Sequence, residues 1–227
     1  MNRTVVSIPF RHLAAAISLA CALHLGAAPA CQAQQAQAAK PTAPFVAKPG
    51  ERVHWKAVAS PLRGEKGKPA DGDPHMTELE MEKTPAAARL IQRWSHGKTS
   101  ESWIADGYLL NSFPALPDDI YATALSMRPA GQDDGVSDFH AMYPGFGWLE
   151  AQFFAGEVTE NGKRCWHFVQ PETGRQAWVD AESRAPVAFA RGGFKYTLAF
   201  LPSPERDPAM PERFRTTLKN YKKADNQ

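Results

Sequence analysis

The alternation of apolar and polar residues is clearest in the last third of the chain, where it has the two-residue period of a half-buried strand. Four apolar residues would lie on one side of that strand: Phe194, Tyr196, Leu198 and Phe200. Gly192-Gly193 precedes it and favours the positive φ angles of a tight hairpin, and Asn161-Gly162 predicts another hairpin upstream. The pattern predicts an antiparallel meander of about five strands. Its segments are 151–159, 163–170, 175–180, 187–190 and 194–200.

The first half of the chain is less regular but contains further segments with strand character. They are Val53–Ala59, Met76–Glu82, Thr99–Ile104, Tyr108–Asn111 and Ile120–Met127. Thr84–Trp94 is open between a helix, because Thr84-Pro85 is typical of a helix start, and a strand, which is favoured. Residues 64–74 and 129–147 predict loops. The fold class expected over 50–204 is mainly β (α+β), a single curved antiparallel sheet or incomplete barrel with few helices.

The first residues of the chain form an export signal. Arg3 and Arg11 precede the apolar run Leu13–Leu25, which is shorter than a membrane span and leads to Ala28-Pro29-Ala30, a site typical of signal peptidase. We therefore expect a signal peptide over 1–30 and a mature protein in the periplasm, at the outer membrane or secreted. Residues 31–49 are rich in Ala, Gln, Lys and Pro and predict a disordered tether.

Cys31 directly follows the predicted cleavage site, and this position leaves two interpretations open. In a bacterial lipoprotein signal, the cysteine receives a diacylglycerol, which would anchor this chain to a membrane. Ala28 and Pro29 stand where such signals usually carry Leu and a small flexible residue, so the alternative is a protein released by cleavage. Cys165 is either a buried thiol, which is favoured, or the partner of Cys31 in a disulfide.

Removal of the leader changes the net charge, because Arg3 and Arg11 leave with it. The whole chain has 26 Lys and Arg against 24 Asp and Glu, so the mature protein is formally neutral. This balance removes any argument for nucleic acid or for an acidic partner. The segment 205–227 is locally basic, and we expect a solvated, partly frayed tail there rather than a contact with lipid headgroups or a partner.

The Trp-x-Asp pattern of Trp178–Asp180 is followed by a turn to Pro186-Val187, a Gly turn and the strand Phe194–Phe200. With the export signal and the meander, this order resembles the carrier fold of the lipoprotein-localisation carrier and receptor superfamily. The resemblance implies an incomplete barrel, plugged by helices, whose apolar inside holds acyl chains. No residue here matches the acyl-gating positions of that group, and its plugging helices are not evident. The pattern also fits a plain strand and turn, with Trp178 in the core and Asp180 capping the turn.

Aromatic side chains are the best candidates for lining a ligand groove or for meeting a partner. Six are singled out: Tyr143, Phe146, Trp148, Phe153, Trp166 and Trp178. The first three lie on a Gly-rich loop, where packing demands large rings less than it does in a strand. The loop is interpreted either as a lid or partner-facing patch, or as a segment folded down over the sheet with its rings buried.

No motif in the sequence points to catalysis, to a metal or to a cofactor. One acidic cluster lies near a histidine, and it lacks the order of a calcium loop: Asp133, Asp134, Asp138 and His140. Ser95-His96-Gly97-Lys98 fits Ser-x-x-Lys, but the elements that accompany it in penicillin-binding enzymes are missing. We therefore expect no catalytic residue, no metal ligand and no cofactor.

These observations favour an exported envelope protein that binds rather than catalyses. The first hypothesis is a curved sheet that holds an apolar or acyl-bearing ligand. The second is an envelope scaffold or sensor that binds a protein partner through its sheet face. The third, less favoured, is a hydrolase of envelope polymers. A membrane is expected as a partner only if Cys31 is lipidated.

Overall fold

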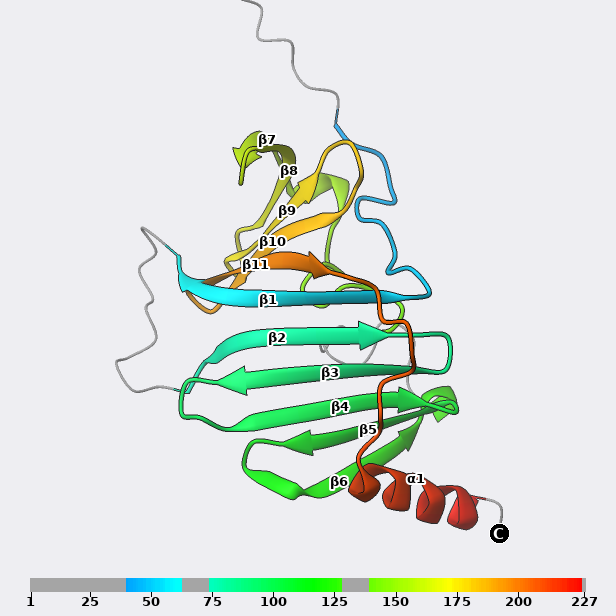
Figure 1. Ribbon diagram of the computed structural model, residues 1–227. Coiled ribbons are helices and arrows are strands. Elements are labelled where there is room, and N and C mark those ends of the chain that lie inside the picture. Colours follow the sequence, from blue (N-terminus) through cyan, green and yellow to red (C-terminus); the bar gives the residue numbers. More distant parts are fainter. Residues whose placement is uncertain (1–39, 63–73, 128–138, 226–227) are drawn as a thin grey trace, which may run out of the picture. The chain divides into compact units, whose positions relative to one another are not determined.

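Antiparallel pairing builds one sheet in the computed structural model, which describes residues 40–62, 74–127 and 139–225. Over these residues the sheet has eleven strands in the order β6-β5-β4-β3-β2-β1-β11-β10-β9-β8-β7 (Figure 1). It is not closed, because β6 and β7 remain as its two edges, and the predicted mainly β fold with a single open sheet is confirmed. The strands are β1 Val53–Pro61, β2 Met76–Lys83, β3 Ala87–Trp94, β4 Thr99–Ala105, β5 Tyr108–Phe113, β6 Leu116–Ala124, β7 Phe154–Glu160, β8 Lys163–Gln170, β9 Arg175–Asp180, β10 Pro186–Arg191 and β11 Phe194–Leu201.

Two meanders, β1–β6 and β7–β11, are joined by the pairing of the first strand with the last. The register places Trp55 opposite Phe200 and Ala57 opposite Leu198. Each meander follows from sequence-local hairpins, whereas the β1–β11 contact links segments about as far apart as the domain allows. This pairing makes one continuous sheet of two locally folded halves.

The glycine-containing turns have the backbone that the sequence predicts. Asn161 and Gly162 take φ angles of 50° and 75° between β7 and β8, and Gly192 and Gly193 take 58° and 77° between β10 and β11. Consecutive positive φ angles are those of the tight turn whose twist matches paired strands. Both predicted hairpins are confirmed, and Asn-Gly and Gly-Gly set their registers.

Three predicted element boundaries receive an outcome from the structure. The ambiguous segment Thr84–Trp94 is a strand from Ala87 onward, because the Thr84 hydroxyl and backbone close a turn onto Ala87. The strand predicted over Ile120–Met127 is misplaced: β6 already ends at Ala124, and a 3₁₀ turn, η1, spans Leu125–Met127. A second 3₁₀ turn, η2 (Ala151–Phe153), occupies the start of the strand predicted over 151–159.

The two faces of the sheet are chemically different because side chains alternate along each strand. The inner face is defined here as the one that carries the largest apolar cluster, with buried residues from both meanders. Its central members are Trp55, Met81, Leu90, Phe168, Val179, Phe189 and Tyr196. The outer face is the opposite one, and smaller apolar clusters lie on it.

The C-terminal segment forms a helix, α1 (Glu212–Asp225), which corrects the expectation of a solvated, frayed tail over 205–227. The helix covers the outer face at β5 and β6 (Figure 1). Phe214 and Leu218 are buried there against Trp103 and Leu110, and the rings of Trp103 and Phe214 lie 6.2 Å apart. The prediction rested on the basic side chains, which lie on the exposed side of the helix. The apolar pair Phe214 and Leu218 has the i, i+4 spacing that packs a helix onto a sheet.

Part of the predicted tether also packs onto the sheet. Residues 31–39 lie outside the described residues, but the Phe45 ring lies 5.4 Å from that of Phe168, edge to face. The Ala47 N–H donates to the Arg184 carbonyl at 2.8 Å, and the Arg184 guanidinium donates to the Pro44 carbonyl at 2.9 Å. The expectation of disorder is wrong for this stretch, because the sheet supplies the apolar partners that the segment lacks.

Replacing Phe214 by alanine is expected to destabilise the fold by about 3–5 kcal/mol, because it empties a fully buried site between α1 and Trp103. Urea denaturation with far-UV circular dichroism measures the change. The control, Lys219→Ala on the exposed side of α1, is expected to cost less than about 0.5 kcal/mol. Equal effects of the two substitutions would contradict the docking of this helix.

Candidate ligand-binding face

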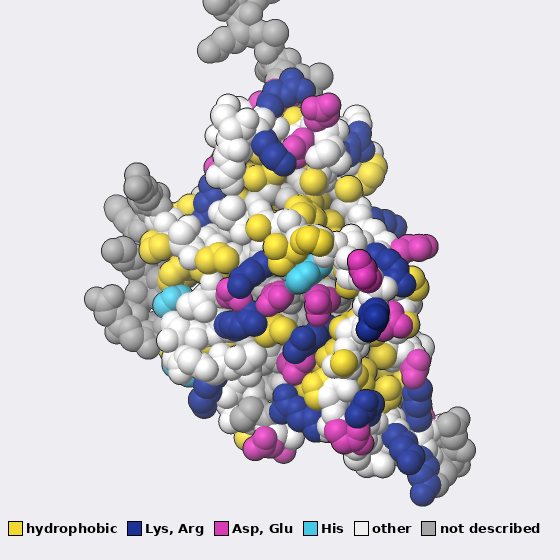
Figure 2. Space-filling view, viewed as in Figure 1, with side chains coloured by type: hydrophobic (Ala, Val, Ile, Leu, Met, Phe, Trp, Pro, Cys, Tyr) yellow, Lys and Arg dark blue, Asp and Glu magenta, His cyan; other side chains and the backbone are white. Residues whose placement is uncertain are grey.

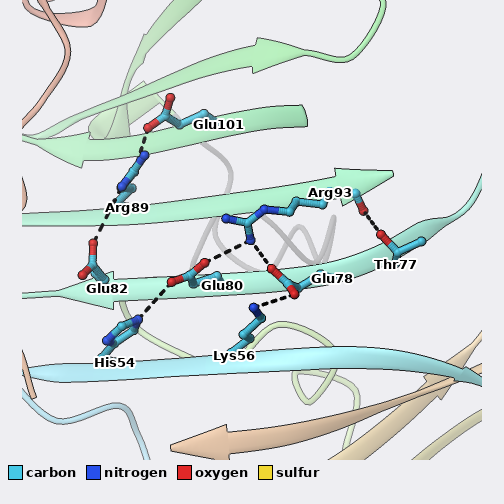
Figure 3. Close-up of polar contacts among 9 residues, drawn as sticks. All are labelled: His54, Lys56, Thr77, Glu78, Glu80, Glu82, Arg89, Arg93 and Glu101. Carbon is cyan, nitrogen blue, oxygen red and sulfur yellow. Dashed lines mark hydrogen bonds and ion pairs between the residues drawn. The ribbon is translucent and has the colours of Figure 1, made fainter. Parts of the chain in front are cut away.

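Polar residues dominate the outer face between β1 and β4, where basic and acidic strands alternate. β1 contributes basic residues, β2 acidic ones, β3 basic ones and β4 an acidic one. Figure 3 shows the resulting ladder of contacts across the four strands. Its charged members are His54, Lys56, Glu78, Glu80, Glu82, Arg89, Arg93 and Glu101.

The ladder pairs its carboxylates with basic groups at short range. Glu80 lies 3.2 Å from His54 Nε2 and 3.0 Å from an Arg93 nitrogen, and Lys56 Nζ lies 2.6 Å from Glu78. Glu101 is buried and accepts from Arg89 Nε at 2.7 Å and from an indole N–H at 3.0 Å. Figure 2 shows these charged side chains as a band across the middle of this face. An apolar ligand would have to displace hydrogen-bonded charge here, so the inner face is the candidate site.

The inner face is overlaid by residues 139–153, here called the cover segment, which has no regular structure apart from η2. Its rings point into the apolar cluster: Tyr143, Phe146 and Trp148 are all buried. Tyr143 lies 6.1 Å from Trp55 and Phe146 lies 5.9 Å from Phe189, measured between ring centroids. Of the two interpretations of this loop, the structure has the one with rings folded down over the sheet.

Gly145 fixes how closely the cover segment approaches the sheet. Its φ angle is +89°, and a Cβ atom there would lie 2.8 Å from the Phe189 ring. The Gly145 carbonyl accepts from Trp148 Nε1 at 2.8 Å, which pins the neighbouring indole. Phe189 stacks on Tyr196 at 4.7 Å, so it has little room to yield.

The structure brings five of the six predicted contact residues together. Phe153 and Trp166 pack, partly buried, against the same inner cluster as the three rings of the cover segment. Trp178 lies on the opposite face, stacked on His167 at 4.8 Å with Lys195 Nζ 4.1 Å from its ring. A single groove therefore does not contain all six.

The Trp-x-Asp pattern has the plain structural role that the sequence analysis offered as its alternative. Asp180 Oδ1 accepts from the backbone N–H groups of Glu182 and Ser183, each at 3.0 Å, and so caps the β9–β10 turn. The hydrogen bond from Ser183 is the main reason that the pKa of Asp180 lies below its ordinary value. Trp178 is buried in an outer-face cluster with Cys165.

The Cys165 thiol is buried and free, as one of the two predicted alternatives has it. Burial raises the pKa of this thiol, so it is a weak nucleophile at neutral pH. Cys31, the predicted attachment site for lipid, lies outside the described residues, as do residues 1–30 of the predicted signal peptide.

A cavity of about 390 Å³, here called the rim cavity, lies where the β2–β3 and β4–β5 turns meet at the edge of the inner face. Ala88 and Ile104 form its floor and also belong to the inner cluster, so it opens directly beside that cluster. Lys83, Asp106 and His140 are among its other walls. The cavity was not predicted from the sequence, because two turns that are distant in sequence create it. The sequence features that could have indicated the cavity are the small residues 86–88 and Gly107, which leave space at these two turns.

The remaining chemical candidates are dispersed. Asp133, Asp134 and Asp138 lie outside the described residues, and His140 lines the rim cavity. Within residues 40–62, 74–127 and 139–225, no three His, Cys, Asp or Glu side chains are grouped as metal ligands. No helix in these ranges is long and apolar enough to cross a bilayer.

Comparison with known proteins gives a likeness in fold alone. No protein-family model matches the chain, and no curated protein matches it. Among solved structures, the Mycobacterium tuberculosis lipoprotein LppX is similar with 10% sequence identity and a TM-score of 0.35, covering 70% of this chain and 90% of that one. The likeness is weak, and it carries no argument about ligand or activity.

Replacing Gly145 by alanine is expected to loosen the cover segment, because a Cβ atom there clashes with the Phe189 ring. The matched control is Gly97→Ala: Gly97 has a similar φ of +79° but open space around it. Both variants carry the strain of a positive φ angle. The clash with Phe189 is expected to destabilise Gly145→Ala by about 1–3 kcal/mol more than Gly97→Ala. Equal losses of unfolding free energy in urea would contradict close contact between the cover segment and the sheet.

The stability contributed by Glu80 is expected to depend on pH. Burial raises the pKa of this carboxyl, but hydrogen bonds and charge from Arg93 and His54 outweigh burial and leave it below the ordinary value. Stabilisation is therefore present above the unfolded value of about 4.3 and is lost as pH falls through the lower folded value. Urea unfolding measured at a series of pH values should show that wild type has a higher free energy of unfolding than Glu80→Gln. This difference should become smaller below about pH 4.3.

The reference for that measurement is Glu172→Gln, which removes a carboxylate at the exposed β8–β9 turn. If the difference in unfolding free energy between wild type and Glu80→Gln stays constant down to the lowest pH at which the protein is folded, the ladder has no such role in stability.

Proposed function

We propose that this chain is an exported cell-envelope protein that binds an apolar or acyl-bearing ligand against the inner face of its open sheet. The observation that supports this most is how the largest apolar cluster is covered. That cluster spans both meanders, yet over residues 139–153 it is overlaid by an irregular segment rather than by a strand or long helix. Such a cover can open without breaking any strand pairing.

The backbone of the cover segment makes local turns. Its hydrogen bonds include Phe146 N–H to Tyr143 O at 3.2 Å, Leu149 N–H to Phe146 O at 3.3 Å and Phe153 N–H to Glu150 O at 3.0 Å. Opening of a segment held by its own turns and by side-chain packing costs less free energy than unfolding of the sheet. A ligand that replaces the ring contacts can therefore enter with the sheet intact.

The rim cavity supplies the entrance. Its volume of about 390 Å³ falls within the range of small-molecule sites, and its floor residues continue into the inner cluster. A chain-like ligand with one end in the rim cavity would extend along the apolar side of the sheet. The export signal predicted over residues 1–30 supports binding in the cell envelope, and a lipidated Cys31 would hold the protein at a membrane.

A protein-binding scaffold is the second candidate, and exposed apolar side chains at the β5–β6 edge favour it. Phe113, Leu116 and Tyr121 are each about half exposed, and the Phe113 and Tyr121 rings lie 5.5 Å apart. Asp118 and Asp119 are exposed on the same edge strand, and charges there discourage pairing with another strand. The proposal is binding, with no catalytic step assigned to any residue.

The test is lipid extraction from protein purified natively from the envelope, followed by mass spectrometry. We expect one co-purified acyl lipid species per protein molecule in wild type. Ala86→Trp is expected to lower that amount at least about tenfold, because Ala86 is exposed at the rim cavity and the indole would fill it. Lys98→Trp, at an exposed turn outside the rim cavity, is the matched control and should retain lipid.

Intact mass of the same preparation reports whether Cys31 carries a diacylglycerol. Wild-type protein that yields no lipid and binds no added acyl probe would overturn the proposed function. If a crosslinker placed at Phe113 of that protein also captured one specific partner protein, the scaffold would become the better-supported function.

A further inference from the structure

The polar groups of the rim cavity differ in how far their charge or hydrogen bonding is already satisfied. Asp106 pairs with Lys222 at 2.5 Å, so its charge is compensated. The Thr84 hydroxyl is buried and bonded to the backbone of Ala87 in both directions. The wall also includes the exposed carboxylate of Glu51 and the half-buried ammonium of Lys83.

Lys83 is the last residue of β2, two positions after Met81, so alternation places it on the inner face. Its Cα lies opposite Ala88, a floor residue of the rim cavity. Among the described residues, no carboxylate lies within ion-pair distance of its ammonium group, and Glu51 acts on it only from further away. The ammonium therefore stands at the junction of cavity and apolar cluster without a direct counterion.

Burial lowers the pKa of Lys83, and the charge of Glu51 opposes that change without cancelling it. A lowered pKa means that the lost hydration of the ammonium exceeds the compensation it receives from the protein. An anion bound in the rim cavity would supply that compensation. Glu51 also lines the rim cavity, but it is exposed and belongs to a segment outside the strands.

We propose that the rim cavity binds the anionic head group of an acyl ligand, with Lys83 as its counterion and the chain directed along the inner face. The inference rests on the proposed function and adds the charge of the ligand to it. Carboxylate and phosphate head groups share this chemistry, since each presents anionic oxygens to an ammonium. The small side chains around the cavity leave room for either.

The experiment compares two probes with the same chain, palmitate and hexadecanol, by isothermal titration below the concentration at which they aggregate. Wild type is expected to bind palmitate about tenfold more tightly than hexadecanol, as a charge-assisted hydrogen bond would give. Lys83→Met should remove the preference, so that palmitate and hexadecanol bind this variant with similar affinity. Lys98→Met, at an exposed turn elsewhere, should keep the preference.

Glu51→Gln provides a change in the opposite direction. Removing this carboxylate removes the residual competition for the Lys83 ammonium, so palmitate should bind more tightly and hexadecanol equally. Thermal unfolding of each variant checks that the sheet remains folded. A set of phosphate-headed probes with the same chain then separates the two sources of anionic head group.

The outcomes separate the two proposals. Equal affinity of wild type for both probes, or a palmitate preference that survives Lys83→Met, overturns the role of Lys83 and leaves acyl binding standing. Failure of wild type to bind either probe overturns the proposed function together with this inference. Preference in wild type that is lost in Lys83→Met supports both.

Discussion

The pairing of β1 with β11 is the contact on which the rest of the structure depends. Each meander can form from its own hairpins, but a half-sheet with one apolar face has nothing to cover it. The register from His54–Leu201 to Pro61–Phe194 aligns Trp55 and Ala57 with the apolar side of β11, so the two apolar faces become one. Slipping this register by one residue would turn those side chains to the charged face.

The chemical difference between the charged outer face and the apolar inner face follows from that alignment. On the outer face, acidic β2 lies between basic β1 and β3 and forms ion pairs with both, and buried Glu101 ties the ladder to Arg213 of α1 at 3.5 Å. Isolated surface ion pairs contribute little, but a network in which Glu78 and Glu80 each hold two basic partners resists rearrangement. One face is thereby fixed, and conformational freedom is left to the cover of the other.

Hairpins were predictable from sequence because Asn161-Gly162 and Gly192-Gly193 encode their turns locally. The β1–β11 contact and the rim cavity were not, since each arises from segments that meet only after folding. Trp166 and Trp178 illustrate the limit at the candidate site. Both were predicted as aromatics of one groove, but β8 and β9 pair Trp166 with Val179 and His167 with Trp178, which sends the two indoles to opposite faces. The alternation of side chains along one strand can be predicted from the sequence. The register between two strands can be predicted only where the turn that joins them is also predicted.

Helix α1 shows a different kind of omission. Phe214 and Leu218 were visible at helical spacing, but the surrounding basic residues suggested a solvated end. Charge on one side of a helix says little about its other side, and the apolar pair decides where the segment packs.

The inner face is occupied by the protein's own rings, and this sets the terms on which any ligand binds. Tyr143, Phe146 and Trp148 already hold the contacts that an acyl chain would make, so affinity equals the difference between the two sets of contacts. Under the proposed function, a short chain would replace too little buried area to displace three rings, whereas a long chain with a charged end would also gain at Lys83. Under the proposed function, the closed state is the resting state, and selectivity for long amphipathic ligands would follow from the competition itself.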